Sequence, residues 1–390
     1  MERVCHIITK LELGGAQQNT LFTVAHLNPS TFHPILIVGE SGFLDAEARA
    51  LPHVEFHQVP VLVRRMHPLR DLQALWVLTR LLRRLRPTIV HTHSSKAGIL
   101  GRIAAKLAGV PIIIHSIHGF GFTPRQHSVY RRALIFAERT VSAWTTRFFS
   151  VSEANRRQGI AHGLFPPDRC TVIRSGVDFQ AIRQVTVSVP EKKRTLGLDR
   201  DRPVVGVIAA MKPQKAPLDF VRLAAVVAAT RPDCQFVMVG DGELRPMVEA
   251  EIRRLTLDRA FHLLGWRRDV PDILRCLNVL VLPSLWEGLP RVYLEAILSG
   301  VPIVGTRVDG GEEVVRDGIT GYLVEPGDIL GMATRVLEIF NEGWQRPSDS
   351  PESLLGPEFD IWEMVHRQEA EYLQLIRECR PDPTSLPVTG

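Results

Sequence analysis

Pro203-Val204-Val205-Gly206-Val207-Ile208, in the middle of the chain, is a short apolar run that decides the fold. It follows a polar and charged stretch, residues 178–203, in which the apolar pattern of the first half gives way. A strand-like run that restarts after such a break indicates a second domain. A chain of 390 residues is also long enough for two domains, each with its own core.

Strand-like apolar runs alternate with helical patterns on both sides of this break. The runs before it are residues 4–9, 34–39, 54–59, 88–93, 112–118, 147–151 and 170–173. The runs after it are residues 203–209, 235–240, 261–265, 279–283, 302–305 and 322–324. This alternation predicts parallel sheets of right-handed βαβ units, with strands covered on both faces. We therefore expect an α/β protein of two doubly wound, Rossmann-like domains that face each other across a cleft, with ligands at the carboxyl ends of the strands.

The composition favours a globular protein that handles anions. Hydrophobic residues make up 45%, charged residues 23%, and the formal net charge is +5. Basic clusters such as residues 83–86 suit phosphates or an anionic membrane surface, although a solvated basic face explains any one cluster equally well. The five scattered cysteines argue for a reducing compartment and against a disulfide frame or zinc site. With no signal-peptide pattern and no apolar run near the roughly 20 residues of a membrane span, we expect a cytoplasmic protein that can lie against the inner face of the plasma membrane.

The most informative stretch for function is residues 283–296. A buried strand ends at Pro283, a loop follows, and Pro290 is placed to begin a helix. Free backbone N–H groups at such a helix start attract anions. Glu287 would lie in the loop and Glu295 on the helix, about 12 Å apart along a continuous helix, which suits opposite ends of one extended ligand. A helix cap and an ordinary polar helix residue explain the two glutamates equally well.

Two further loops of the second half support phosphate binding. Lys212 and Lys215 follow its first strand, where two ammonium groups would neutralise a diphosphate. Gly240 and Gly242 form a tight strand-to-helix turn, in which the backbone can approach a ligand. Taken singly, lysines are common in solvated loops and the glycine turn is a weak signal.

The first half has a glycine loop and many histidines. Gly15 lies in a glycine loop, residues 13–17, between the first strand and the first helix, whose start favours phosphate. The G-x-G-x-x-G pattern of dinucleotide enzymes is missing. His118 follows a strand at the same edge and is a candidate contact for a sugar or a transferring phosphate, although a lone histidine is more often structural. His91 and His93 would share one strand face. No Cys or carboxylate joins them at ligand spacing, so we expect no metal site.

Together these motifs resemble glycosyltransferase family 4. The spacing of Glu287 and Glu295 is similar to the E-x7-E motif of that family. The other similar segments are residues 14–17, 240–242, 264–266 and 310–315. The resemblance covers residues 3–375, and the order and spacing of its short motifs make it specific.

The resemblance implies a GT-B enzyme with an acceptor-side domain at residues 1–180, completed by a crossover helix at 361–376, and a nucleotide-sugar-binding domain at 200–345. It implies a retaining hexosyltransferase that moves a sugar from a nucleotide diphosphate sugar to a saccharide or lipid-linked acceptor, in polysaccharide or glycoconjugate biosynthesis. It implies no metal and no cofactor beyond the donor substrate. No nucleic-acid partner is expected.

The resemblance also implies roles for single residues. Glu295 would bind the ribose hydroxyls, Lys215 the diphosphate, and Glu287 would approach the donor sugar. The residues expected to bind the donor are Gly15, Lys212, Lys215, Gly288, Leu289, Pro290, Arg291 and Glu295. Those expected at the reacting centre are Glu287, His118 and Lys215. No carboxylate is placed to act as a covalent nucleophile, so the acceptor hydroxyl would attack on the face from which the diphosphate departs.

Two departures from the family pattern bear on the function. The family commonly has Gly-Arg before its lysine, and the arginine helps to hold the diphosphate, whereas this chain has Ala209 and Ala210. Lys212 is the candidate replacement for that charge. In residues 174–178, Ser175 stands directly before Gly-Val-Asp, where the family usually has asparagine. A nucleotide-sugar 2-epimerase of the same fold and a non-catalytic nucleotide-sugar-binding subunit are therefore the alternatives.

Overall fold

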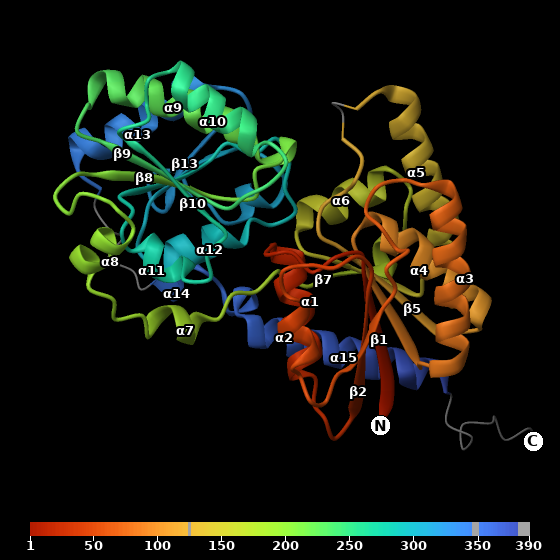
Figure 1. Ribbon diagram of the computed structural model, residues 1–390. Coiled ribbons are helices and arrows are strands. Elements are labelled where there is room, and N and C mark those ends of the chain that lie inside the picture. The colour runs from red at the N-terminus through yellow and green to blue at the C-terminus, as the bar shows by residue number, and fades with distance from the viewer. Residues whose placement is uncertain (124–125, 345–350, 381–390) are drawn as a thin grey trace, which may run out of the picture. The chain divides into compact units, whose positions relative to one another are not determined.

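The chain folds into two compact units. The computed structural model describes residues 1–123, 126–344 and 351–380, with side chains from 353 onward in the last segment. Unit 1 comprises Met1–Gly176 and Ile361–Gly390, and unit 2 comprises Val177–Asp360 (Figure 1). The polar stretch expected between the domains contains two short helices, α7 (Phe179–Arg183) and α8 (Val189–Thr195), which belong to unit 2.

Unit 1 is built on a seven-stranded parallel sheet of order β3-β2-β1-β4-β5-β6-β7. Its strands are β1 (Glu2–Ile8), β2 (Phe32–Val38), β3 (Glu55–Gln58), β4 (Ile89–His93), β5 (Ile112–Ile117), β6 (Arg147–Ser150) and β7 (Cys170–Val172). Its α-helices are α1 (Gly15–His26), α2 (Asp45–Arg49), α3 (Pro68–Leu85), α4 (Ser95–Ala108), α5 (Ser128–Ser142), α6 (Glu153–Ala161) and α15 (Ile361–Cys379). The strand order reverses between β1 and β4, which is where open α/β sheets bind ligands.

Unit 2 repeats the plan with a six-stranded parallel sheet of order β10-β9-β8-β11-β12-β13. Its strands are β8 (Val204–Ile208), β9 (Gln235–Val239), β10 (Phe261–Gly265), β11 (Val279–Leu282), β12 (Ile303–Thr306) and β13 (Gly321–Val324). The helices after α8 are α9 (Pro217–Thr230), α10 (Arg245–Arg254), α11 (Val270–Leu274), α12 (Arg291–Leu298), α13 (Ile329–Glu342) and α14 (Pro351–Leu354). The two doubly wound sheets confirm the predicted fold class.

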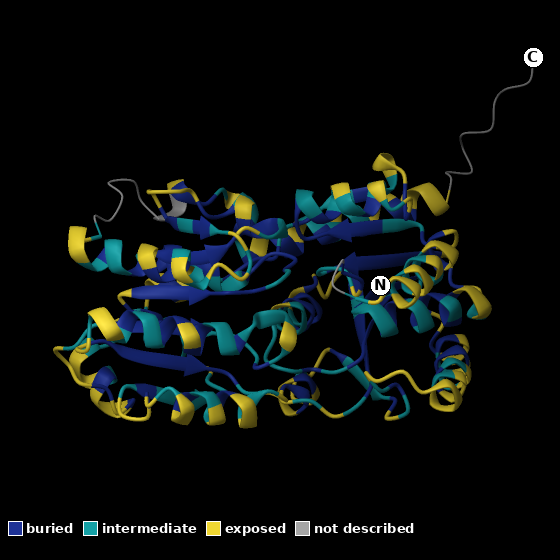
Figure 2. Ribbon diagram, turned by 90° about the horizontal axis from the view of Figure 1, so that it is seen from above, coloured by how far each residue is buried: buried dark blue, intermediate teal, exposed yellow. Residues whose placement is uncertain are grey.

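Most strands of unit 1 are buried on both faces, as their apolar sequences predict (Figure 2). The edge strand β3 is half-buried. One face of the sheet presents Cys5 and Ile7 to α3 and α4. The opposite face presents Val4 to α15, the last helix (blue in Figure 1). α15 follows unit 2 in the sequence but packs on the sheet of unit 1. Tyr372 of α15 is fully buried there. The period of two along β1 thus decides which side chains meet which helix layer.

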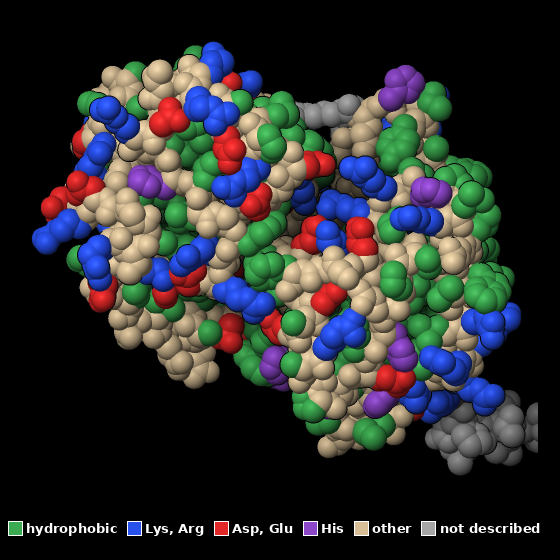
Figure 3. All heavy atoms as spheres, viewed as in Figure 1, with side chains coloured by type: hydrophobic (Ala, Val, Ile, Leu, Met, Phe, Trp, Pro, Cys, Tyr) green, Lys and Arg blue, Asp and Glu red, His purple; other side chains and the backbone are tan. Residues whose placement is uncertain are grey.

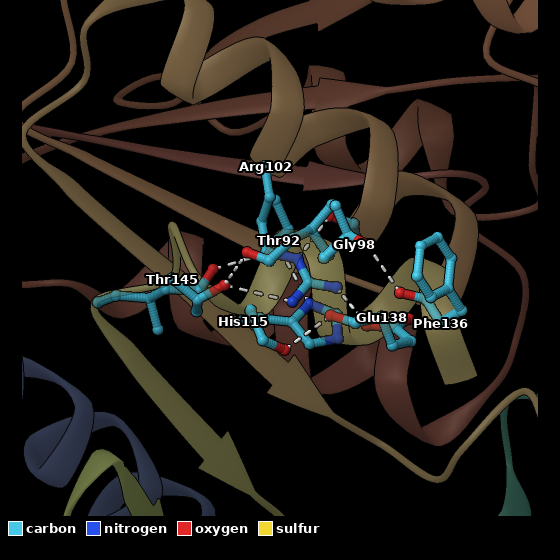
Figure 4. Close-up of polar contacts among 11 residues, drawn as sticks. Thr92, Gly98, Arg102, His115, Phe136, Glu138 and Thr145 are labelled. Atoms are coloured by element: carbon cyan, nitrogen blue, oxygen red, sulfur yellow. Dashed lines mark hydrogen bonds and ion pairs between the residues drawn. The ribbon is translucent and has the colours of Figure 1, made fainter. Parts of the chain in front are cut away.

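A buried ion pair fixes α5 to α4 (Figure 4). The Arg102 guanidinium is fully buried; it pairs with the Glu138 carboxylate and also donates to Gly98 O, at 2.8 Å, and to Thr145 Oγ1, at 3.3 Å. Gly98 has no room for a side chain, because a Cβ atom there would lie 2.5 Å from the His115 ring. These contacts fix the helix that follows the loop after His118.

Candidate functional site

Two loops of unit 2 meet at the carboxyl edge of its sheet. The loop after β8 contains the turn η2 (Pro213–Lys215), and the loop after β11 leads to α12. β8 and β11 are neighbouring parallel strands, so their loops leave from the same edge. Gln214 joins the loops, because its carbonyl accepts from Leu285 N, at 2.8 Å, and its side-chain amide donates to Trp286 O, at 2.9 Å. These bonds fix the chain positions directly before Lys215 and Glu287, the expected site residues.

Lys215 and Glu287 form an ion pair across these loops. Lys215 Nζ lies 2.5 Å from Glu287 Oε1. The Glu287 side chain is only 6% exposed and that of Lys215 is 18% exposed. Water screens such a pair weakly, so each charge depends on the other. The structure therefore brings together two residues that the sequence placed 72 positions apart.

Asp309 is a third member of this site, and the sequence analysis missed it. Its carboxylate accepts a hydrogen bond from the backbone N–H of Glu287, at 2.9 Å. Burial, the largest cause, raises the pKa of Asp309 to about 6, and the nearby Glu287 charge acts in the same direction. Its backbone is left-handed, with φ of 40°, a conformation that aspartate tolerates better than most residues. The signal was its position directly before residues 310–315, a segment already noted for its resemblance.

Glu295 lies on α12 and has a different partner from Glu287. Its carboxylate is 4.0 Å from the guanidinium of Arg291, one turn earlier on the same helix. Burial raises the pKa of Glu295, while the Arg291 charge opposes that shift. Pro290 occupies the N-cap position rather than the first helical turn, and no described side chain caps the helix. The backbone of Gly288, Leu289, Pro290 and Arg291 thus forms a helix start with the character of an anion site.

The remaining expected residues of unit 2 border the same loops. Lys212 begins the η2 turn that ends at Lys215. Gly240 has φ of 127°, and a Cβ atom there would lie 2.1 Å from the carbonyl oxygen of Ala209. Glycine is required at this position, because the turn after β9 packs directly on the loop after β8. Ala209 and Ala210, which stand where the family commonly has Gly-Arg, thus lie where the backbone of the β8 loop packs on the backbone at Gly240.

In unit 1, Gly15 is the first residue of α1, and no described side chain caps that helix either. His118 follows β5, and its ring bonds His93. His118 lines a small cavity together with Asn19, which lies one turn after Gly15 on α1. Asn19 is buried, and neither atom of its amide has a partner among the described residues.

The histidines of unit 1 form a cluster that the sequence predicted in part. His91 and His93 do lie on one face of β4, and His6 joins them from β1, so that ring nitrogens of all three lie within 4.8 Å of one another. We expected no metal site because the sequence showed no third ligand beside His91 and His93. That reason is wrong, since His6 is a third residue of a ligand type at the required distance. All of these nitrogens except His6 Nε2 are nevertheless already hydrogen bonded. His6 Nδ1 and His118 bond the two nitrogens of His93, and the hydroxyls of Tyr372 and Ser116 bond those of His91. The cluster is thus a hydrogen-bond network in this structure.

Burial keeps these histidines neutral. It lowers the pKa of His6 to about 3 and that of His118 to about 4. It also lowers the pKa values of His91 and His93 well below the usual range, and the neighbouring histidines act in the same direction. None of these rings therefore carries a charge near pH 7.

Comparisons with known proteins match both halves of the chain. Residues 13–181 match the family model "Glycosyltransferase Family 4", and residues 202–342 match "Glycosyl transferases group 1". A UDP-Gal:alpha-D-GlcNAc-diphosphoundecaprenol alpha-1,3-galactosyltransferase from Escherichia coli is 35% identical over 87% of this chain and 88% of its own length. The capsular polysaccharide biosynthesis glycosyltransferase CapM from Staphylococcus aureus is 24% identical over 70% of this chain and 72% of its own length.

Solved structures share the fold. HepE from Anabaena, in complex with UDP and glucose, superposes with a TM-score of 0.80 at 19% identity, over 96% of this chain and all of that one. Sucrose-phosphate synthase from Thermosynechococcus elongatus gives a TM-score of 0.81 at 16% identity, over 97% of this chain and all of that one. At such identities the likeness shows the fold alone, and it is the GT-B fold that the motifs predicted. Taken with the galactosyltransferase relative and both family models, it shows that this chain is a glycosyltransferase and belongs to glycosyltransferase family 4.

Proposed function

We propose that the protein transfers a hexose from a UDP-sugar to a lipid-linked saccharide at a membrane surface, with retention at the anomeric carbon. The Lys215–Glu287 pair carries this proposal, because it holds an ammonium group and a carboxylate beside an uncapped helix start. The relative named for a UDP-galactose donor and a diphosphoundecaprenol acceptor supports the substrate classes. Nothing in the matching family models favours the epimerase or the non-catalytic subunit.

Binding of the donor would use the loops of unit 2. Lys212, Lys215 and the start of α12 would stabilise the charge that develops on the departing diphosphate, and Glu295 would bind the ribose. Loss of one such prearranged donor typically costs roughly 10²–10³ in rate. Glu287 would hold Lys215 until the diphosphate arrives and then approach the sugar. The reaction would need no metal, since lysine and backbone amides supply the positive charge.

The acceptor would reach the protein from a bilayer that binds unit 1. Among the described residues, no helix is long and apolar enough to cross a membrane. The outer face of α3, however, exposes Leu69, Leu72 and Trp76, by 75%, 66% and 59%. Arg80, one turn on, stacks over the Trp76 ring at 4.8 Å. Hydrophobic and basic side chains gather along this edge of unit 1 in Figure 3, a combination that favours binding at the interface of an anionic bilayer.

The transfer proposal is tested with the intact protein. It would be incubated with a panel of radiolabelled nucleotide diphosphate sugars and a synthetic polyprenyl diphosphate saccharide, followed by NMR of the product linkage. We expect a UDP-hexose to be transferred, with its anomeric configuration kept. An inverted linkage would refute retention. Conversion of the donor alone into an epimer would favour the epimerase, and tight donor binding without turnover would favour the non-catalytic subunit.

The membrane proposal is tested separately by co-sedimentation with vesicles rich in anionic lipid. Leu72→Ala with Trp76→Ala should weaken binding at least tenfold, because together they remove most of the exposed apolar surface of α3. Leu330→Ala is the matched control, since Leu330 is 67% exposed on α13 of unit 2. Equal binding by the double variant and the control would refute this surface.

A further inference from the structure

A chain of three histidines runs through the buried α15 face of unit 1. His6 lies on β1, His93 ends β4, and His118 follows β5, so each ring comes from the next strand of the sheet. His6 Nδ1 lies 3.0 Å from His93 Nε2, and His93 Nδ1 lies 3.1 Å from His118 Nε2. The rings of His6 and His93 are stacked, with 8° between their planes. Each nitrogen–nitrogen contact is a hydrogen bond and holds one proton.

Counting protons shows that the three rings must share one tautomer. A neutral imidazole has one N–H and one lone pair. If His6 donates from Nδ1, then His93 must accept at Nε2 and donate from Nδ1, and His118 must accept at Nε2 and carry its proton on Nδ1. The reverse direction puts every proton on Nε2. The three histidines therefore have two tautomeric states, which differ in the position of the proton on every ring.

The two ends of the chain decide between these states. His6 Nε2 and His118 Nδ1 are both buried and lack a partner among the described residues. A buried N–H without an acceptor is rarer than a buried acceptor without a donor. Either state leaves one N–H at one end of the histidine chain and one lone pair at the other, so the N–H belongs at the end where it can meet an acceptor.

The His118 end is the one that can find a partner. His118 and Asn19 line the same cavity, which has a volume of about 20 Å³, room for roughly one water molecule or one hydroxyl group. The Asn19 amide has neither of its hydrogen-bonding atoms paired. A buried polar group without a partner costs free energy, so this cavity is suited to a group that bonds both side chains.

We propose that His6 and His93 are positioning residues that fix His118 in its Nδ1–H form, as a hydrogen-bond donor to an oxygen atom in the cavity shared with Asn19. Only the identity of that oxygen rests on the proposed function: it is a hydroxyl of the sugar substrate, and a water molecule takes its place when no substrate is bound. His93 also lines the cavity, but both of its ring nitrogens are taken by the bonds to His6 and His118, so His6 and His93 act on the oxygen atom through His118.

The tautomers are measured directly by ¹⁵N NMR of the full-length protein with ¹⁵N-labelled histidine at pH 7, in the absence of substrate. Single substitutions, His6→Gln, His93→Gln and His118→Gln, assign the signals. We expect all three rings to be neutral and protonated on Nδ1. A ring protonated on Nε2, or a charged ring, overturns the proposal. Because this measurement needs no catalysis, its failure is distinct from a failure of the proposed transfer reaction.

A double-mutant cycle tests the action through His118. His93→Leu should lower kcat/KM for sugar transfer about fivefold, the effect of one lost hydrogen bond, and His93→Gln, which can both donate and accept, should lower it less. In a His118→Ala background, His93→Leu should have no further effect. The control is His115→Asn, because His115 is buried on the opposite face, where it bonds Thr92. An unchanged fivefold loss in the His118→Ala background shows a purely structural role and refutes the proposal.

Discussion

Replacement of Lys215 by methionine tests whether the ion pair of unit 2 holds the two loops together. The change removes the ammonium group and leaves the Glu287 carboxylate, 6% exposed, without its cation. Removal of one partner from a buried pair costs about 3–5 kcal/mol. Lys215 is 18% exposed, so water can compensate in part, and we expect about 3 kcal/mol. For a domain of this size, that loss lowers the melting temperature by roughly 6–12 °C.

The assay is differential scanning calorimetry of Lys215→Met, Glu287→Gln and the double variant. Glu287→Gln should cost less than Lys215→Met, because the neutral amide can still accept from the lysine. The double variant should be more stable than Lys215→Met, since no buried charge is left without a partner. If Lys215→Met lowers the melting temperature by less than about 2 °C, or if the double variant shows simple additivity, then the pair is a solvated contact and this reasoning fails.

Three further predictions concern single positions. The pKa of Asp309 is raised to about 6 from its usual 3.8, so the folded protein binds the proton more tightly than the unfolded chain. The free energy of unfolding should therefore fall by up to about 3 kcal/mol as pH rises from about 4 to 6, and then level off. Urea denaturation should show this fall in the wild type and not in Asp309→Asn. Gly240→Ala should destabilise by about 1–3 kcal/mol in the same assay, because its new methyl group meets Ala209 O and its φ is left-handed; an unchanged midpoint would contradict the strain. Arg102→Met should speed hydrogen exchange in α5 at least tenfold, because it leaves the Glu138 carboxylate without its buried cation; unchanged α5 exchange would show that other contacts hold the helix.

The architecture could be predicted from the sequence because each strand has a local sequence pattern of its own. Each apolar run is short, covered on both faces and followed by a helical pattern, and these signals need no knowledge of distant residues. The loops that carry Lys215 and Glu287 could be predicted as candidate binding loops for the same reason, because ligands of such sheets bind at the carboxyl ends of the strands. The roles assigned to these residues, and to Gly15 and Glu295, stay predictions until a donor is bound.

The missing parts of the site all depend on contacts between distant segments. The Asp309 carboxylate accepts a hydrogen bond from the backbone N–H of Glu287. A sequence pattern does not predict which distant backbone group an aspartate will bond. His6 stands 85 positions before His91, and only the pairing of β1 with β4 makes them neighbours. Asn19 looks like an ordinary helix residue until its unpaired amide appears in a cavity. Such contacts follow from strand order and register, which local periodicity leaves open.

The histidine chain in turn helps to specify that register. In β1 the side chains alternate, so His6 faces α15 while Cys5 and Ile7 face α3 and α4. A slip of one residue between β1 and β4 would move His6 into the apolar layer and separate it from His93. Each lost hydrogen bond there would leave a buried polar atom unpaired, at about 1–3 kcal/mol each, whereas a purely apolar strand would lose much less. The buried polar chain thus stabilises one pairing of β1 with β4 over its neighbours. The pairing of β4 with β5 then places His118 at the carboxyl edge of the sheet, where open α/β sheets typically bind ligands.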